Sequence, residues 1–126
     1  MRYRTIRQAV VILLCLFLGT ACAHRNPGRR AAQLNGHAVH LAERQLWQEA
    51  EFYLERAVKT AHDDPRVLNN MAVLLEQKGN YEVAMALYNK ALFLAPHSSV
   101  ITHNLKALQA MLDDAGEKDA GDDKSR

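Results

Sequence analysis

The segments GNYEVA at residues 79–84 and YNKALFLAP at residues 88–96 decide the fold of this 126-residue chain. Gly79 suits a positive-φ turn that ends one helix, and Pro96 ends the following helix because proline cannot continue it. Ala84 lies between them, where a small side chain lets a neighbouring antiparallel helix approach closely. The pattern predicts two closely packed antiparallel helices joined by a short turn.

A weaker copy of this pattern occurs 34 residues earlier, where Trp47 aligns with Tyr81 and Ala50 aligns with Ala84. A period of this length is typical of helical repeat proteins. The spacing of turn residue, aromatic, Ala, aromatic, Ala and Pro resembles the tetratricopeptide repeat family. The residues that define the repeat are Trp47, Ala50, Ala57, Gly79, Tyr81, Ala84, Tyr88, Ala91 and Pro96.

The resemblance implies an all-α fold: a short α-solenoid of two tetratricopeptide hairpins and a C-terminal capping helix. The domain spans residues 31–112 and consists of a degenerate repeat at 31–64, a repeat at 65–98 and the capping helix at 99–112. The first repeat is degenerate because Gln45 occupies the position of the turn glycine. We expect helices at 31–45, 47–61, 66–78, 81–95 and 99–112, and a disordered acidic tail at 113–126.

The N-terminus reads as an export signal. Basic residues precede a continuous apolar run at residues 9–18, which is shorter than the roughly 20 residues of a membrane-spanning helix. The following sequence, LGTAC at 18–22, resembles the lipobox of bacterial lipoproteins. This resemblance implies a lipoprotein signal peptide at 1–21 and a diacylglyceryl (palmitate-containing) modification of Cys22. Cleavage after Ala23, giving a soluble periplasmic protein, and an uncleaved inner-membrane anchor stay open as alternatives.

Residues 22–30 would then form a lipid-anchored, flexible basic tether. The residue after the cysteine is Ala23 and not Asp. In lipoproteins of this kind, the absence of Asp at this position resembles the default sorting to the outer membrane. The resemblance therefore implies the periplasmic side of the outer membrane. The overall net charge of +2 does not describe the folded part, because residues 31–111 carry seven basic and eight acidic residues, a net −1. This balance argues against a nucleic-acid-binding protein.

Catalytic and metal-binding patterns are scarce. We expect no enzyme activity, because no serine or thiol of the mature chain has a histidine and an acid at the spacing of a catalytic triad. His37 and His40 lie one helical turn apart, but no third ligand completes a zinc set. We therefore expect no cofactor and no metal.

Binding residues are implied by the family, in which the first helix of each repeat lines a concave groove. The groove residues mapped in this way are Asn35, Val39, Arg66, Asn69, Asn70, Val73, Gln77, His103 and Asn104. Asparagine amides both donate and accept hydrogen bonds, so they suit a peptide backbone; packing between repeats is the alternative use of Asn70 and Asn104. The paired basic residues with which some relatives clamp a C-terminal carboxylate are missing.

These expectations define two functions. The first is a membrane-anchored periplasmic adaptor or scaffold that binds protein partners, in the manner of pilus-assembly and secretion-associated lipoproteins of similar layout. The second is a self-associating structural protein of the envelope, since two repeats and a cap make a short array for which about three repeats are the usual minimum.

Overall fold

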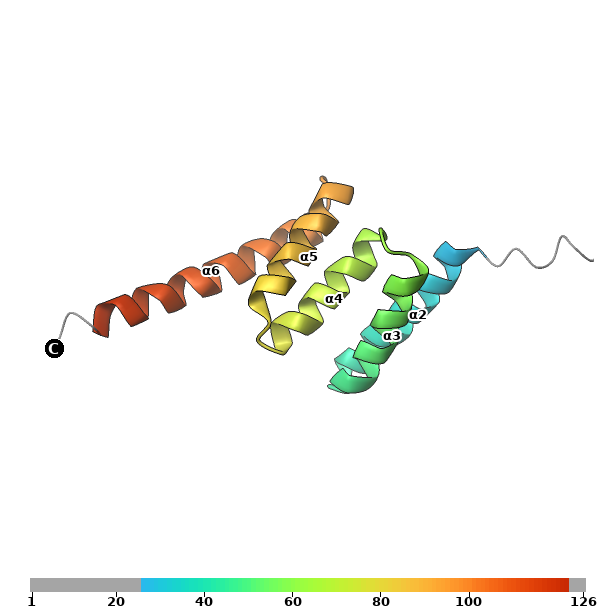
Figure 1. Cartoon of the computed structure of the whole chain (residues 1–126), viewed down its shortest axis with the longest axis horizontal. Helices are drawn as coiled ribbons and strands as arrows, with labels where there is room; N and C mark the ends of the chain where they lie inside the picture. The colour runs from blue at the N-terminus through green and yellow to red at the C-terminus, as the bar shows by residue number, and fades with distance from the viewer. Residues whose placement is uncertain (1–25, 123–126) are drawn as a thin grey trace, which may run out of the picture.

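The computed structural model describes residues 26–122, and within this range the chain forms five helices and no strand. The all-α prediction is thus confirmed. The helices follow one another along the long axis of the molecule (Figure 1). Their bounds are α2 Pro27–Glu43, α3 Trp47–Thr60, α4 Pro65–Gln77, α5 Tyr81–Leu94 and α6 Ser99–Asp122.

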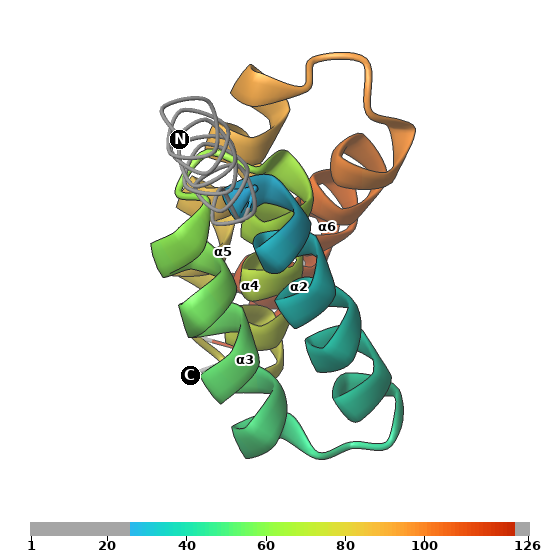
Figure 2. The ribbon, with the colours of Figure 1, turned by 90° about the vertical axis from the view of Figure 1, so that its right-hand side faces the viewer.

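The helices pair as two hairpins, α2 with α3 and α4 with α5, followed by α6 alone (Figures 1 and 2). Helix α4 also contacts α2 on one side and α6 on the other, whereas the fully described helices α3 and α5 do not contact each other. The first helices of the hairpins therefore form the inner row of a curved stack. This arrangement confirms the predicted short solenoid of two hairpins and a final helix.

The turns inside the two hairpins have the same hydrogen bonds. In the first, Leu46 N donates to Leu41 O over 3.0 Å; in the second, Asn80 N donates to Leu75 O over 2.9 Å. This six-residue closure requires a left-handed residue just before the donor. Gly79 fills that position with φ 77°, and Gln45 adopts φ 61° in the first turn.

The core consists of two clusters that share α4. Leu74 of α4 packs with residues of α2 and α3, whereas Leu68 and Ala72 of the same helix pack with α5 and α6. Four alanines of the repeat pattern have no exposed surface, which explains how the helices of each hairpin approach so closely. They are Ala50, Ala57, Ala84 and Ala91.

The first helix starts earlier than predicted, so the flexible tether assigned to 22–30 is wrong for residues 27–30. Asn26 Oδ1 accepts a hydrogen bond of 3.0 Å from Gly28 N, and Pro27 occupies the first helical position. Asp64 and Pro65 begin α4 in the same way, with Asp64 accepting from Arg66 N. An Asx residue followed by proline caps a helix regardless of the basic residues that follow.

The last helix runs to Asp122, so the disordered tail predicted from residue 113 is wrong for residues 113–122. Leu112 still packs against the second core cluster, and adding residues to an existing helix requires no new nucleation. The outer face of α6 is polar: Lys106 and Gln109 stand where α4 has Ala72 and Leu75. A polar outer face suits the end of a stack.

Candidate functional site

The inner row of helices α2, α4 and α6 carries the groove residues expected from the sequence. Asn35 and Val39 lie on α2, and His103 and Asn104 lie on α6. The remaining five residues come from α4, which lies between them. The fold therefore brings residues that are up to 69 positions apart onto three neighbouring helices.

Four asparagines of this set form a continuous chain of side-chain hydrogen bonds across the three helices. Asn104 Nδ2 donates to Asn69 Oδ1 over 3.1 Å, and Asn69 Nδ2 donates to Asn70 Oδ1 over 3.1 Å. Asn70 Nδ2 then donates to Asn35 Oδ1 over 2.9 Å. These amides link successive repeats, which is the packing role that the sequence left open as an alternative to peptide binding.

The chain of amides also limits what the asparagines offer to a ligand. Asn69 is buried and uses both its oxygen and its amide group within the chain. Asn35 is bonded there through its oxygen and Asn104 through its amide nitrogen, so each retains the opposite half of its side chain for hydrogen bonding. The two ends of the chain are thus better placed to meet a peptide backbone than its middle.

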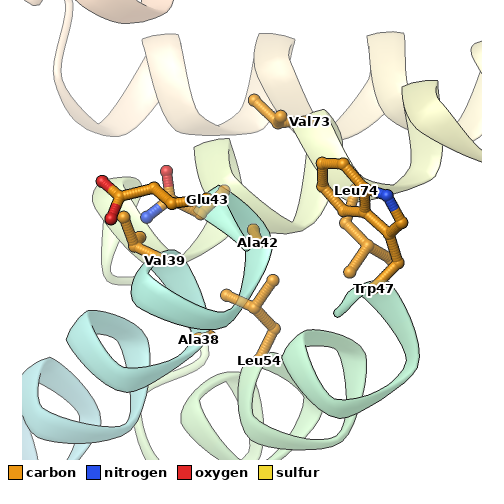
Figure 3. A pocket seen from close by; sticks show the side chains of 9 residues that line it. Ala38, Val39, Ala42, Glu43, Trp47, Leu54, Val73 and Leu74 are labelled. Atoms are coloured by element: carbon orange, nitrogen blue, oxygen red, sulfur yellow. The ribbon is translucent and has the colours of Figure 1, made fainter. Parts of the chain in front are cut away.

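An apolar hollow of about 280 Å³ lies between α2, α3 and α4. Val39 and Glu43 of α2 form one side, Trp47 and Leu74 form the other, and Leu54 points in from α3 (Figure 3). Val39, Asn70 and Val73 are the expected groove residues that border it. The other residues bordering the hollow were not among the expected groove residues: Ala38, Ala42, Glu43, Trp47, Leu54 and Leu74.

The hollow lies where the first repeat has smaller side chains than the second at two positions, one buried and one partly buried. Tyr88 is fully buried in the second repeat, and its hydroxyl donates to Glu76 Oε2 over 2.9 Å. Leu54 and Ala42 occupy the corresponding positions of the first repeat, 34 residues earlier. The sequence signal for the hollow is therefore the replacement of Glu76 and Tyr88 by Ala42 and Leu54 at the equivalent positions of the first repeat.

The Tyr88 phenol is enclosed at the position that corresponds to Leu54. Burial raises the pKa of the Tyr88 phenol well above its ordinary value, and the hydrogen bond to Glu76 raises this pKa further. The phenol is therefore neutral at physiological pH and acts as the donor in the bond to the carboxylate.

Six expected groove residues do not border the hollow. Three of them are Asn35, Asn69 and Asn104 of the asparagine chain, and the other three lie elsewhere on the helices. Arg66, at the start of α4, is exposed and forms an ion pair of 2.9 Å with Asp64. The hydrogen bond from the Arg66 side chain lowers the pKa of the Asp64 carboxyl. Gln77 and His103 are exposed on α4 and α6.

The remaining sequence predictions concern the N-terminus and the histidines. Cys22 and the signal peptide fall outside the described residues. Among residues 26–116, whose side chains the structure describes, no three His, Cys, Asp or Glu residues gather as a metal site would require. His37 instead packs edge-on against the Tyr53 ring, with 4.3 Å between centroids. None of the described helices has both the length and the apolar character needed to cross a membrane.

Comparison with known proteins locates one family match. No curated protein matches the chain. The sequence profile described as tetratricopeptide repeat matches residues 65–98, which are α4, α5 and the loop after α5. These are the residues predicted to form the second repeat, and repeats of this family generally mediate protein–protein interaction without catalysis. Residues 65–98 of this chain are a tetratricopeptide repeat.

Proposed function

We propose that this protein is an adaptor that holds a segment of a partner protein along the inner face formed by α2, α4 and α6. The observation that carries the proposal is the apolar hollow, which opens beside the expected groove residues Val39 and Val73. Exposed apolar hollows flanked by polar groups are typical of binding sites. The fold is one that other proteins use for protein–protein interaction.

The chemistry of the inner face suits a peptide segment. Asn35 and Asn104 each retain part of an amide for hydrogen bonds to a backbone. Val39 is 38% exposed and adds apolar contact surface beside the hollow. Amides bind a peptide backbone whatever its side chains, so this part of the face supplies affinity and the hollow supplies selectivity.

We also propose that the chain is exported, lipidated on Cys22 and held on the periplasmic side of the outer membrane, where it acts in assembling an envelope complex such as a pilus or secretion system. Four residues, 23–26, separate Cys22 from Pro27 at the start of α2. They can span at most about 14 Å. Arg29 and Arg30 lie exposed in the first turn of α2, which contains no acidic residue. Anionic headgroups would complement these charges.

Site-specific photo-crosslinking tests the adaptor function. We place benzoylphenylalanine at Gln77, exposed on the inner-row helix α4, and in a matched variant at Val83, exposed on α5. The proposal expects a partner protein crosslinked in cells at position 77 and absent at position 83. The same products at both positions, or products at position 83 alone, would overturn the inner-face assignment.

Intact mass spectrometry tests the anchor. A lipidated N-terminus would begin at Cys22 and carry the mass of two or three acyl chains, and a Cys22→Ser variant would lack them. A mature chain that begins at unmodified His24 would instead identify a periplasmic protein without a lipid.

Self-association is the second candidate function, and one observation favours it. Phe93 and Leu94 at the end of α5 are 84% and 37% exposed, and Val100 at the start of α6 is 61% exposed. Large apolar side chains so exposed are common at interfaces between subunits. Sedimentation equilibrium would detect dimers that Phe93→Ser abolishes and Val83→Ser retains; a monomer at all concentrations would exclude this function.

A further inference from the structure

We infer that the hollow beside Trp47 receives one aromatic side chain of the partner segment, and that this segment carries a lysine or arginine next to the aromatic residue. The inference rests on the proposed adaptor function and specifies the chemistry of its ligand. It depends on the size of the hollow, on the second repeat as an internal template, and on the charge beside the hollow.

The size of the hollow suits an aromatic ring. Its volume is about 280 Å³. An apolar cavity of roughly 150 Å³ in another protein is large enough to bind benzene. Trp47 and Leu74 line one side, so an entering ring would contact both an aromatic and an aliphatic surface.

The second repeat shows which kind of side chain fills the equivalent space. Ala72, Leu108 and Tyr88 pack in one core cluster there. Ala38, Leu74 and Leu54 stand at the same positions of the first repeat and also share one cluster. The two clusters thus share an alanine and a leucine at equivalent positions. Among their buried residues only the second has an aromatic ring, Tyr88, whereas the partly buried Tyr53 packs against the first cluster. An aromatic residue from outside would complete the first repeat in the same manner.

The charge beside the hollow selects the neighbouring residue of the ligand. Glu43 borders the hollow, its side chain is 68% exposed, and its carboxylate points outward (Figure 3). Its partner, His40 Nδ1, lies 3.6 Å away and is equally exposed. A lysine or arginine of the ligand would therefore meet a carboxylate that remains accessible to solvent. Because both groups are exposed, such a pair makes a small contribution to affinity.

Trp47 provides a direct measurement, because it is the only tryptophan of the chain. The full chain in lipid nanodiscs is titrated with the capped hexapeptide Ala-Ala-Phe-Lys-Ala-Ala while the tryptophan emission is recorded. We expect a saturable shift of the emission to shorter wavelength as the ring displaces water. A peptide with Ala in place of Phe should give no saturable shift. A peptide with Glu in place of Lys should bind about two- to fivefold more weakly.

Two variants test the site itself. The double change Leu54→Tyr with Ala42→Glu reproduces the tyrosine–carboxylate pair of the second repeat and should abolish the peptide response. Phe52→Tyr, which adds the same hydroxyl at an exposed position of α3, is the matched control and should leave the response unchanged. Glu43→Gln removes only an exposed charge, so the protein should stay folded while the preference for the Lys peptide over the Glu peptide disappears.

Several results would overturn the inference. Peptide binding that survives Leu54→Tyr with Ala42→Glu in a folded protein would place the ring elsewhere. A tryptophan shift caused by detergent alone, and competing with the peptide, would identify an acyl chain as the occupant. Absence of any response to the Phe-Lys peptide, with crosslinking at position 77 intact, would reject the aromatic ligand and leave the adaptor function standing. Loss of the crosslink itself would reject the adaptor function.

Discussion

The two repeats have the same hairpin and differ in how it is maintained. Both turns close with the same pair of hydrogen-bonded positions, Leu46 to Leu41 and Asn80 to Leu75. The second turn has glycine at the left-handed position, whereas the first places Gln45 there at φ 61°. The first repeat therefore keeps the turn at an energetic cost, which shows that packing of the two helices outweighs the local preference of the residue at the turn.

The repeats also differ in whether the space between their helices is filled. The second contains Tyr88, which has no exposed surface and is bonded to Glu76. The first contains Leu54 and Ala42 and leaves a hollow of about 280 Å³. We therefore expect the loss of a core side chain to cost more stability in the second repeat than in the first, and the proposed ligand site lies in the first repeat.

The largest expected effect is the loss of Tyr88. Tyr88→Ala should lower the free energy of unfolding by about 3–5 kcal/mol, because it opens a cavity in the sealed repeat and removes the partner of Glu76. Leu54→Ala should lower it by roughly 2–3 kcal/mol, at the lower end of leucine-to-alanine changes, because the leucine already borders an open hollow. Urea denaturation measures both. Equal losses, or a larger loss for Leu54→Ala, would contradict the difference in packing between the repeats.

The next effect concerns the asparagine chain that joins the repeats. Asn69→Ala should lower the free energy of unfolding by about 1–3 kcal/mol, because it removes the donor to Asn70 Oδ1 and the acceptor for Asn104 Nδ2, while Asn70 keeps its hydrogen bond to Asn35. Asn89→Ala is the control, since Asn89 is exposed and bonds only to the Met85 carbonyl of its own helix. The same urea experiment should show less than about 0.5 kcal/mol for the control.

The turn residues allow a reciprocal exchange between the repeats. Gln45→Gly should raise the free energy of unfolding by about 1 kcal/mol, and Gly79→Gln should lower it by a similar amount, because a side chain is strained at positive φ. Gly36→Ala provides a contrast: Gly36 lies inside α2, and an added Cβ meets no atom within 4 Å. It should stabilise the protein by about 0.5–1 kcal/mol through helix propensity. Equal signs for the two turn variants would refute the strain argument.

The sequence was informative wherever a feature depends on local spacing. The Gly79 turn, the buried alanines and Pro96 identify residues 65–98 as a repeat, and they place each hairpin helix end to within one or two residues, apart from the start of α2. The early start of α2 is the exception, because a basic segment that contains proline and glycine is also typical of a flexible tether. Asn26-Pro27 nevertheless carries the same capping signal as Asp64-Pro65.

The candidate site could be predicted only in part, because its main feature depends on volume and not on spacing. The family pattern located Val39, Asn70 and Val73. It could not show that the space beside them is empty, since this depends on how far Leu54 reaches across the hairpin. It also could not decide between ligand binding and packing for the asparagines, because the same amides serve both; only their distances in the fold distinguish the two uses.

The smallest expected effect is a difference between the caps of α2 and α4 in how their contribution to stability depends on pH. The hydrogen bond from Arg66 lowers the pKa of Asp64 below its ordinary value of 3.8, whereas Asn26, the cap of α2, carries no charge. A carboxyl whose pKa is lower in the folded state stabilises the protein above its unfolded pKa and loses this contribution as the pH falls through the folded pKa. Asp64→Asn should therefore lower the free energy of unfolding by at most about 1 kcal/mol at pH 7, since Arg66 is exposed and solvent screens the pair.

The difference between wild type and Asp64→Asn should shrink below about pH 4 and vanish once Asp64 is protonated in the folded protein. Asn26→Asp makes the reciprocal change. It should introduce a pH-dependent gain of about 0.3–1 kcal/mol at the start of α2, where Arg29 and Arg30 are otherwise not balanced by an acidic residue in the first turn. Urea midpoints at pH 7 and pH 3 measure all three proteins. If the wild type still has a larger free energy of unfolding than Asp64→Asn at pH 2, the carboxyl group stabilises α4 through packing. The caps of α2 and α4 would then differ in shape and not in charge.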